Sequence, residues 1–295
     1  MFNLFNPHGF TYSIGRSLLA LSLLLTLSFN SAQTLIGPDL QTLTFYNVNI
    51  NLFYILIIND FNFGYFIAKL ILCVVVLGYR PQKFGLLHYW VTLSFINACP
   101  IIDGGDQINS NLTLLLAILT TFDQRKWHWD SFKCLTNEWL KIFLFSVVII
   151  IKIQVSMVYF QAATAKFSVE EWVNGTAVYY WSLHELHGMP LFMREIIKPF
   201  LTSEYIVLIL TWGTLLLELL LVIGPLLNKH CRISLFLIGI SFHAGIVIIH
   251  GLPSFFITMF VALLFLLTSW EAKPPFLRPS MENKNEKMPV ECIAC

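Results

Sequence analysis

The sequence predicts an all-α, polytopic membrane protein, and three observations lead to that fold class. Of the 295 residues, 57% are apolar and only 12% are charged, which is roughly half the charged share of a soluble domain. The mean hydropathy is +0.71. The apolar residues form long continuous runs rather than an alternating pattern, which favours membrane-spanning helices over a transmembrane β-barrel.

The same composition excludes several classes of protein. A chain this apolar has too little polar surface to cover a water-soluble fold of its size, and it is not a disordered chain. The net charge is only +1, so we expect no nucleic-acid partner. The six cysteines form no evenly spaced disulfide framework and therefore do not indicate a redox compartment.

Eight apolar runs approach the length of about 20 residues that a membrane-spanning helix needs. The predicted spans cover residues 14–29, 64–79, 84–99, 108–122, 139–160, 203–226, 233–250 and 253–270. We also expect an interfacial or re-entrant helix near 163–182. The shorter stretch 48–58 is either interfacial or merged with the second span. Together these elements predict one transmembrane domain over 1–270, followed by a polar, flexible cytoplasmic tail over 271–295.

The basic residues are unevenly divided between the two sides of these spans. One side carries thirteen of them, namely Arg16, Arg80, Lys83, Arg125, Lys126, Lys133, Lys141, Lys229, Arg232, Lys273, Arg278, Lys284 and Lys287. The other side carries three, namely Lys166, Arg194 and Lys198. Because basic loops stay in the cytoplasm, we expect both termini to be cytoplasmic and the loop 103–107 to be outside.

Charged side chains inside the predicted spans are candidates for function, because a charge in lipid is costly. Lys69, Lys152 and Glu218 qualify. For Lys69 the simpler interpretation is that its ammonium reaches the membrane interface. Lys152 lies in the middle of a span. It either forms an ion pair with Glu218 or holds an anionic or quinone-like group.

The segment around residues 152–176 contains most of the candidate site residues. Lys152, Tyr159 and Lys166 are spaced by seven, so on a continuous helix they form one stripe. Gln154 lies in the same span, and Trp172 suits a membrane interface. A lysine followed by acids and a tryptophan indicates the lip of a site. The alternative is a lysine that only anchors the helix end.

No metal site is predicted. His243 and His250 are seven residues apart, which separates them by about 10 Å on a helix and is too far for one metal ion. They are either hydrogen-bonding groups or proton carriers. In the segment 184–187 the two histidines stand at i and i+3, whereas a zinc protease motif needs i and i+4. Asp103 and Asp106 enclose two glycines, which we interpret as a turn in an outer loop.

Several motifs, in order, resemble those of the bacterial sporulation-delaying protein B family. They are Gly78-Tyr79-Arg80-Pro81, Asp103-Gly104-Gly105-Asp106-Gln107, Tyr159-Phe160-Gln161-Ala162-Ala163, Glu171-Trp172-Val173-Asn174-Gly175-Thr176 and His250-Gly251-Leu252. The resemblance extends from Arg16 to Trp270. It implies a protein of the bacterial inner membrane that acts with a small protein A-like partner. Their shared substrate would be the precursor of a secreted peptide toxin.

The middle segment also resembles the horizontally transferred transmembrane domain, which includes vitamin K-dependent γ-glutamyl carboxylase. In that family a lysine deprotonates the vitamin K hydroquinone, and the matching position here is Lys166. This chain has Thr164 and Phe167 where the family has glycine and leucine, and the large lumenal domain is absent. The resemblance therefore does not imply carboxylation. It implies a lysine-bearing membrane cavity, with a quinone as the cofactor it would suit.

These observations predict an outward-facing site. Lys166 would be a base or an anion anchor, with Tyr159 and Gln154 as hydrogen-bonding groups, Lys152 as a balancing charge and His243 as a proton relay. The cavity would also contain Trp172, Glu218 and His250. Two other interpretations remain: a non-catalytic channel, exporter or immunity protein, and a scaffold for a soluble processing enzyme. Because no credible protease constellation is present, the sequence does not decide whether the protein is an enzyme.

Overall fold

The computed structural model describes residues 6–36, 51–55, 61–131, 135–185 and 188–270. Over these ranges the chain forms helices and one isolated β-bridge, between Tyr79 and Trp127, and contains no strand. The all-α prediction is confirmed for this part of the chain. The predicted tail 271–295 lies outside it. The chain divides into two compact units, residues 1–151 with 268–295 and residues 152–267, which are described separately below.

Each predicted span coincides with a helix. These helices are α1 (Phe10–Phe29), α4 (Phe61–Leu77), α5 (Pro81–Ala98), α6 (Gly104–Thr120), α7 (Glu138–Lys166), α11 (Glu204–Ile223), α12 (Lys229–His250) and α13 (Pro253–Leu267). In the described ranges, α1, α7, α12 and α11 with its extension η2 (Gly224–Leu226) are long and apolar enough to cross a membrane. Helices α4 and α13 are apolar but shorter. The structure thus agrees with a membrane protein, and eight spans remain a prediction.

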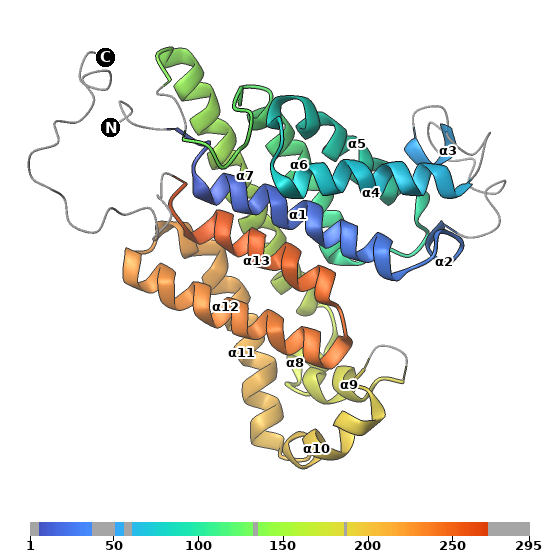
Figure 1. The fold of residues 1–295 in the computed structure, drawn as a ribbon. Helices are drawn as coiled ribbons and strands as arrows, with labels where there is room; N and C mark the ends of the chain where they lie inside the picture. Colours follow the sequence, from blue (N-terminus) through green and yellow to red (C-terminus); the bar gives the residue numbers. More distant parts are fainter. Residues whose placement is uncertain (1–5, 37–50, 56–60, 132–134, 186–187, 271–295) are drawn as a thin grey trace, which may run out of the picture. The chain divides into compact units, whose positions relative to one another are not determined.

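The first unit is built from α1, α4, α5 and α6, which pack against one another in that order, with α1 also contacting α6 (Figure 1). Leu23, Leu72 and Phe95 belong to its apolar core. Gly85 allows α5 to approach the end of α6, because a Cβ atom there would overlap the side chain of Thr120. Close packing through a small residue is typical of membrane helices.

The doubtful stretch 48–58 contains a short helix, α3 (Leu52–Ile55), that packs against α4 and α5. The Asn51 side-chain amide donates to the carbonyl of Ser94 over 2.9 Å, and the Leu52 N–H donates to the Ser94 hydroxyl over 3.0 Å. These bonds hold the segment against α5 within the unit. Its remaining residues, 48–50 and 56–58, lie outside the described ranges, as does most of the chain between α3 and α2 (Ala32–Ile36).

The interpretation of Asp103 to Asp106 as a turn is wrong, because Gly104 and Gly105 already belong to α6. The Asp103 carboxylate accepts the Asp106 N–H over 2.8 Å, and the Asp106 carboxylate accepts the Asp103 N–H over 3.2 Å. This reciprocal capping satisfies two N–H groups that would otherwise lack partners at the start of the helix. The two acids therefore begin α6.

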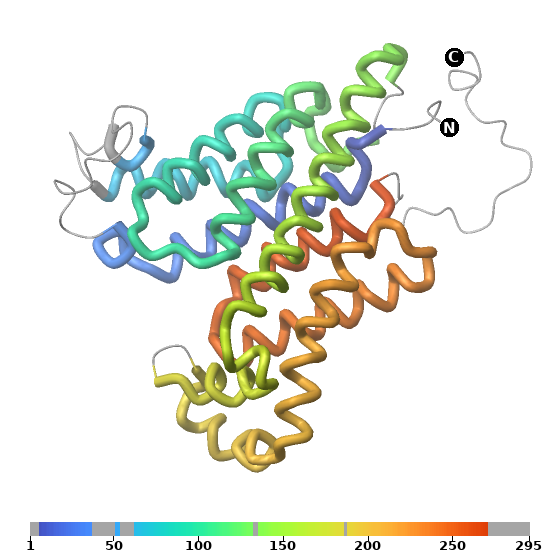
Figure 2. The backbone as a smooth tube through the Cα atoms, turned by 180° about the vertical axis from the view of Figure 1, so that it is seen from behind, coloured from blue at the N-terminus to red at the C-terminus, as the bar shows by residue number. Residues whose placement is uncertain are grey.

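The second unit contains α7 from Lys152 onward, α11, α12 and α13, with α12 and α13 side by side (Figure 1). The expected single helix over 163–182 is wrong. Helix α7 runs unbroken to Lys166 (Figure 2), and two short helices follow it, α8 (Glu170–Val173) and α9 (Ala177–Leu183). Gly175 separates them with a φ of 77°, a conformation that glycine adopts at little cost.

An amphipathic helix is nevertheless present further along the chain, at α10 (Leu191–Leu201). Its residues Met193, Ile197 and Leu201 belong to an apolar cluster that also contains Val207 of α11. Another side leaves large apolar side chains exposed, namely Leu191, Phe192, Ile196 and Phe200. A helix with this distribution is typical of a membrane interface, which is the role that the sequence predicts for residues 163–182.

Candidate functional site

The candidate site lies in the second unit and begins with the stripe on α7. Because α7 is continuous from Glu138 to Lys166, Tyr159 and Lys166 do lie on one side of it, about 10 Å apart along the axis. Lys166 is the last residue of the helix, and its ammonium donates to the Ala162 carbonyl one turn earlier, over 3.2 Å. A cation at this end of a helix is stabilised by the unpaired carbonyl groups.

An ion pair joins Lys166 to Glu218 of α11. The Lys166 Nζ lies 2.6 Å from the Glu218 Oε1 and 2.9 Å from its Oε2. The lysine side chain is 21% exposed and the glutamate side chain only 7%. Removing one partner would leave an uncompensated charge in the unit, whereas the pair is neutral.

Trp172 of α8 lies against the same lysine. Its ring centroid is 5.2 Å from the Lys166 Nζ, which is within the range of a cation–π contact. The chain brings the ring there because it turns at once after α7 and begins α8 at Glu170. The structure thus places Trp172 beside the lysine, as expected for the lip of a site.

A second polar pair joins α7 to α12. The Tyr159 hydroxyl lies 3.1 Å from the Nε2 of His243, and both side chains are buried. The other ring nitrogen of His243, Nδ1, has no hydrogen-bond partner among the described residues. The two pairs influence each other electrostatically, Tyr159 through Glu218 and His243 through Lys166. Lys166, Glu218, Tyr159 and His243 are called the four-residue cluster below.

Lys152 lies in a different place, and the ion pair with Glu218, one of its two interpretations, is not formed, because Glu218 pairs with Lys166. The Lys152 Nζ donates to the carbonyls of Phe265 and Leu266, over 2.9 and 2.7 Å, at the end of α13. Fourteen residues separate it from Lys166, which corresponds to about 21 Å along α7. The helix end offers unpaired carbonyl groups that attract a cation.

Three other residues singled out in the sequence occupy positions along the helices away from Lys166 and Glu218. Gln154 is half-buried on α7 and lies twelve residues before Lys166, about 18 Å along the axis. His250 is the last residue of α12, two turns beyond His243. Lys69, in the first unit, places its ammonium 4.7 Å from the Tyr65 ring centroid.

The rejected zinc motif contains His184, which directly follows α9. The His184 carbonyl accepts a hydrogen bond from the Arg194 Nη2 over 2.8 Å. His187 lies outside the described ranges.

The second unit also has a cavity of about 650 Å³, between the start of α9, the end of α10 and the start of α11. It is lined by Gly175, Tyr179, Tyr205 and Leu208, among others. Leu208 and Glu218 lie on the same helix, ten residues apart, so the cavity lies about 15 Å from the glutamate along α11. This volume is typical of a pocket for a drug-sized ligand or a short peptide segment.

Sequence reasoning missed one polar cluster, which lies in the first unit around Arg16. We counted Arg16 with the loops, yet it belongs to α1 and is only 1% exposed. The sequence does contain an indication of this cluster, because Arg16 falls inside the predicted span 14–29. The rule that selected Lys152 and Glu218 selects this arginine as well.

Comparisons with known proteins place the chain in a family. No protein-family model matches it, and no solved structure matches it. It is similar to two proteins of Bacillus subtilis (strain 168). The uncharacterized protein YitO is 35% identical, over 96% of this chain and 93% of its own length. Sporulation-delaying protein SdpB is 34% identical, over 89% of this chain and 82% of its own length. This chain therefore belongs to the sporulation-delaying protein B family.

Proposed function

We propose that this protein is required for the maturation of a secreted peptide toxin of the sporulation-delaying type. The observation that carries the proposal is the 34% identity to sporulation-delaying protein SdpB over 89% of the chain. The long apolar helices support a multi-pass protein of the bacterial inner membrane. Its partners are the toxin precursor and a small protein A-like protein.

The four-residue cluster is the site where we place the chemistry of maturation. An anionic group of the peptide would compete with Glu218 for the Lys166 ammonium, which now contacts both carboxylate oxygens. A displaced Glu218 is a free carboxylate and can accept a proton. Tyr159 and His243 contact each other and form a neighbouring hydrogen-bonding pair to which this proton can pass. Lys166 acts here as the anchor for the anion.

The residues also fit the quinone that the resemblance to the carboxylase superfamily suggests. The carbonyl oxygens of a quinone accept hydrogen bonds, and a hydroquinone would supply electrons to the reaction. The Lys166 ammonium donates to Ala162 and Glu218, so it would donate to a quinone oxygen once Glu218 is displaced. The buried Nδ1 of His243 has no partner in the described part of the chain. These are the two residues that would hold the oxygens.

The first test is mass spectrometry of the peptide in culture supernatants. Cells that make the toxin precursor and the small partner are compared with and without this protein. We expect the mature peptide only when the protein is present. Equal amounts of the same mature peptide in both cultures would refute the proposed function. Mature peptide that accumulates inside cells lacking the protein would instead indicate export.

The orientation of the chain is tested separately. We propose that both termini are cytoplasmic, as the distribution of basic residues indicates. Cysteine is introduced at exposed Lys83 or Gln107 in a variant without the native thiols, and intact cells are treated with a membrane-impermeant maleimide. Labelling of Gln107→Cys but not of Lys83→Cys is expected. The reverse pattern would invert the topology and place Lys166 on the cytoplasmic side.

A further inference from the structure

Arg16 of the first unit is a buried cation, and one edge of its guanidinium has no hydrogen-bond partner among the described residues. The side chain is 1% exposed, and its Nη1 lies 3.2 Å from the Nδ1 of His128. The other two nitrogens, Nε and Nη2, have no hydrogen-bond partner in the part of the chain that the structure describes. Their N–H groups point in parallel from one edge of the planar guanidinium, which is the fork that binds a carboxylate through two bonds.

The acid that interacts electrostatically with Arg16 is Asp123, and both of its oxygens are already occupied. The Arg125 Nε lies 2.8 Å from the Asp123 Oδ1, and the Arg125 Nη2 lies 2.7 Å from its Oδ2. This pair is neutral, so Arg16 shares Asp123 with Arg125 and has no carboxylate of its own among the described residues. An arginine does not lose its proton in a protein, and a buried charge without a counter-ion is strongly unfavourable.

His128 does not supply the missing negative charge and is itself kept neutral. Burial and, after it, the charges of Arg16 and Arg125 lower its pKa from 6.5 to about 2. The neutral ring accepts the Arg16 N–H at Nδ1, while its Nε2 lies 3.3 Å from the Ser17 hydroxyl. That hydroxyl donates to the Val76 carbonyl over 2.6 Å. The imidazole is thus fixed by α1 and α4 and is not available to a ligand.

A second unused polar atom lies near Arg16. His88 of α5 is 2% exposed, its Nε2 has no partner within the described ranges, and it interacts electrostatically with Arg16. A neutral imidazole with its proton on Nε2 is a hydrogen-bond donor. Arg16 and His88 therefore offer three N–H groups from two helices of the same unit, and none of the three has a partner among the residues that the structure describes.

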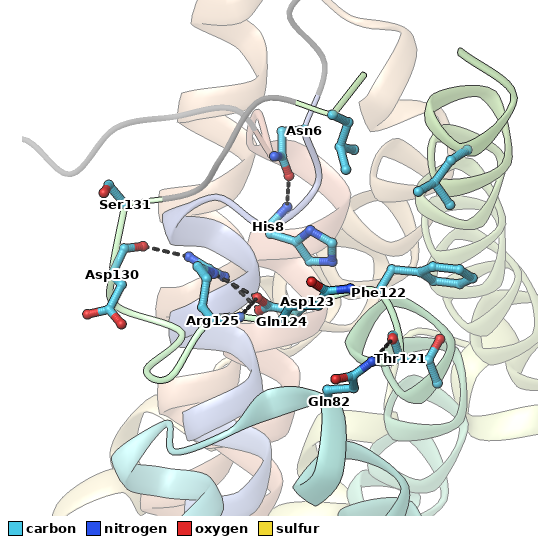
Figure 3. A pocket seen from close by; sticks show the side chains of 12 residues that line it. Asn6, His8, Gln82, Thr121, Phe122, Asp123, Gln124, Arg125, Asp130 and Ser131 are labelled. Carbon is cyan, nitrogen blue, oxygen red and sulfur yellow. Dashed lines mark hydrogen bonds and ion pairs between the residues drawn. The ribbon is translucent and has the colours of Figure 1, made fainter. Parts of the chain in front are cut away.

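The first unit has a cavity of about 710 Å³, which His8, Asp123 and Arg125 help to line (Figure 3). Figure 3 shows His8, Asp123 and Arg125 gathered close together in it. The His8 ring packs edge-on against Tyr12, with 5.2 Å between the ring centroids, and Tyr12 is in turn 6.4 Å from the His128 ring. Tyr12 precedes Arg16 by one turn of α1. The rings of His8, Tyr12 and His128 thus form a series of aromatic contacts that begins at a residue of the cavity and ends at the residue that contacts Arg16.

We propose that the first unit binds a single carboxylate group, held by the Nε and Nη2 of Arg16 and by the Nε2 of His88. The carboxylate enters from the cavity that His8 lines, and it supplies the negative charge that the described part of the unit lacks. A planar group with two oxygens suits the fork, and the burial of both residues excludes a bulky anion. The carboxylate belongs either to a small free acid or to the terminus of a peptide.

The test measures binding of radiolabelled acetate to the purified full-length protein by equilibrium dialysis, at constant ionic strength in chloride. The wild type should bind one acetate in a saturable manner. Arg16→Gln should lose at least tenfold in affinity, and Arg16→Lys should lose less, because lysine keeps the charge without the fork. Lys83→Gln removes an exposed cation of the same unit and should bind as the wild type does.

Two results would overturn the proposal. One is the absence of saturable acetate binding to the wild type, which would mean that water alone occupies the fork. The other is wild-type affinity in Arg16→Gln. If Arg16→Gln does not yield monodisperse protein, Arg16→Lys and His88→Phe provide the same comparison. Competition by the dipeptide alanyl-alanine and by its amide identifies the source. Tighter binding of the free acid dipeptide than of acetate indicates a peptide terminus.

Discussion

The two units bury their cations in different ways. In the second unit Lys166 lies 2.6 Å from Glu218, and the pair is neutral without any further group. In the first unit Arg16 is more deeply buried, and the neighbouring carboxylate of Asp123 is bound by Arg125. A charge inside a membrane protein is costly unless it is balanced. A buried charge therefore indicates a binding site only when one of its charged atoms has no partner within the protein.

The largest expected effect concerns the pair in the second unit. Lys166→Met and Glu218→Gln each leave one charge without its partner, which costs about 3–5 kcal/mol of stability when the site is fully buried. Partial exposure of Lys166 lowers this figure. Each single change should reduce the thermal stability of the purified protein, and the double change should restore part of it. Strictly additive losses would mean that the two side chains do not interact.

A matched control for this comparison of the single and double variants is Lys198→Met. Lys198 is exposed on α10 of the same unit, so its removal should change stability by less than about 0.5 kcal/mol. A loss as large as that of Lys166→Met would show that any lysine of this unit has the same effect.

The next effect concerns pH and the first unit. The pKa of His128 is about 2 in the folded protein against an ordinary value of 6.5. Between these values the unfolded chain binds a proton that the folded chain does not, so stability falls as the pH falls below 6.5. From pH 7 to pH 5 the loss for one such group is about 2 kcal/mol. Melting temperatures at the two pH values should differ less in His128→Asn than in the wild type.

His230→Asn is the control for this experiment, because His230 is exposed at the start of α12. It should keep the pH dependence of the wild type. Equal pH dependence in His128→Asn and the wild type would contradict the burial of a neutral imidazole beside Arg16.

The smallest expected effect is that of Tyr159→Phe. The change removes the hydroxyl that lies 3.1 Å from the His243 Nε2, and a hydrogen bond of this kind contributes about 1 kcal/mol. Tyr179→Phe serves as the control, because its ring is exposed on α9. Equal melting temperatures for the two variants would indicate that the contact between α7 and α12 adds nothing to stability.

The sequence allowed much of the fold to be predicted, because a membrane limits the choice of structure to long apolar helices. Each predicted span coincides with a helix, usually within four residues at either end. The errors lie where side-chain contacts decide the structure. Asp103 and Asp106 begin a helix by capping each other, and Gly175 divides the segment expected to be one interfacial helix.

The candidate site was predictable only in part. The seven-residue spacing placed Tyr159 and Lys166 on one side of α7, because helix geometry fixes that relation. It could not identify the partner of Glu218, which depends on how α11 packs against the end of α7. For this reason the sequence left open whether Lys152 pairs with Glu218, and the structure pairs Glu218 with Lys166 instead. The cluster of Arg16, His88 and His128 comes from three distant segments, and their meeting depends on tertiary packing.

The central claim is that the Lys166–Glu218 pair serves toxin maturation, and one measurement tests it most directly. The yield of mature peptide in culture supernatant is measured for the wild type, Lys166→Ala and Lys198→Ala, each normalised to the amount of the protein in membranes. We expect at least a tenfold lower yield for Lys166→Ala and an unchanged yield for Lys198→Ala. A wild-type yield from Lys166→Ala, at normal membrane abundance, would contradict the claim.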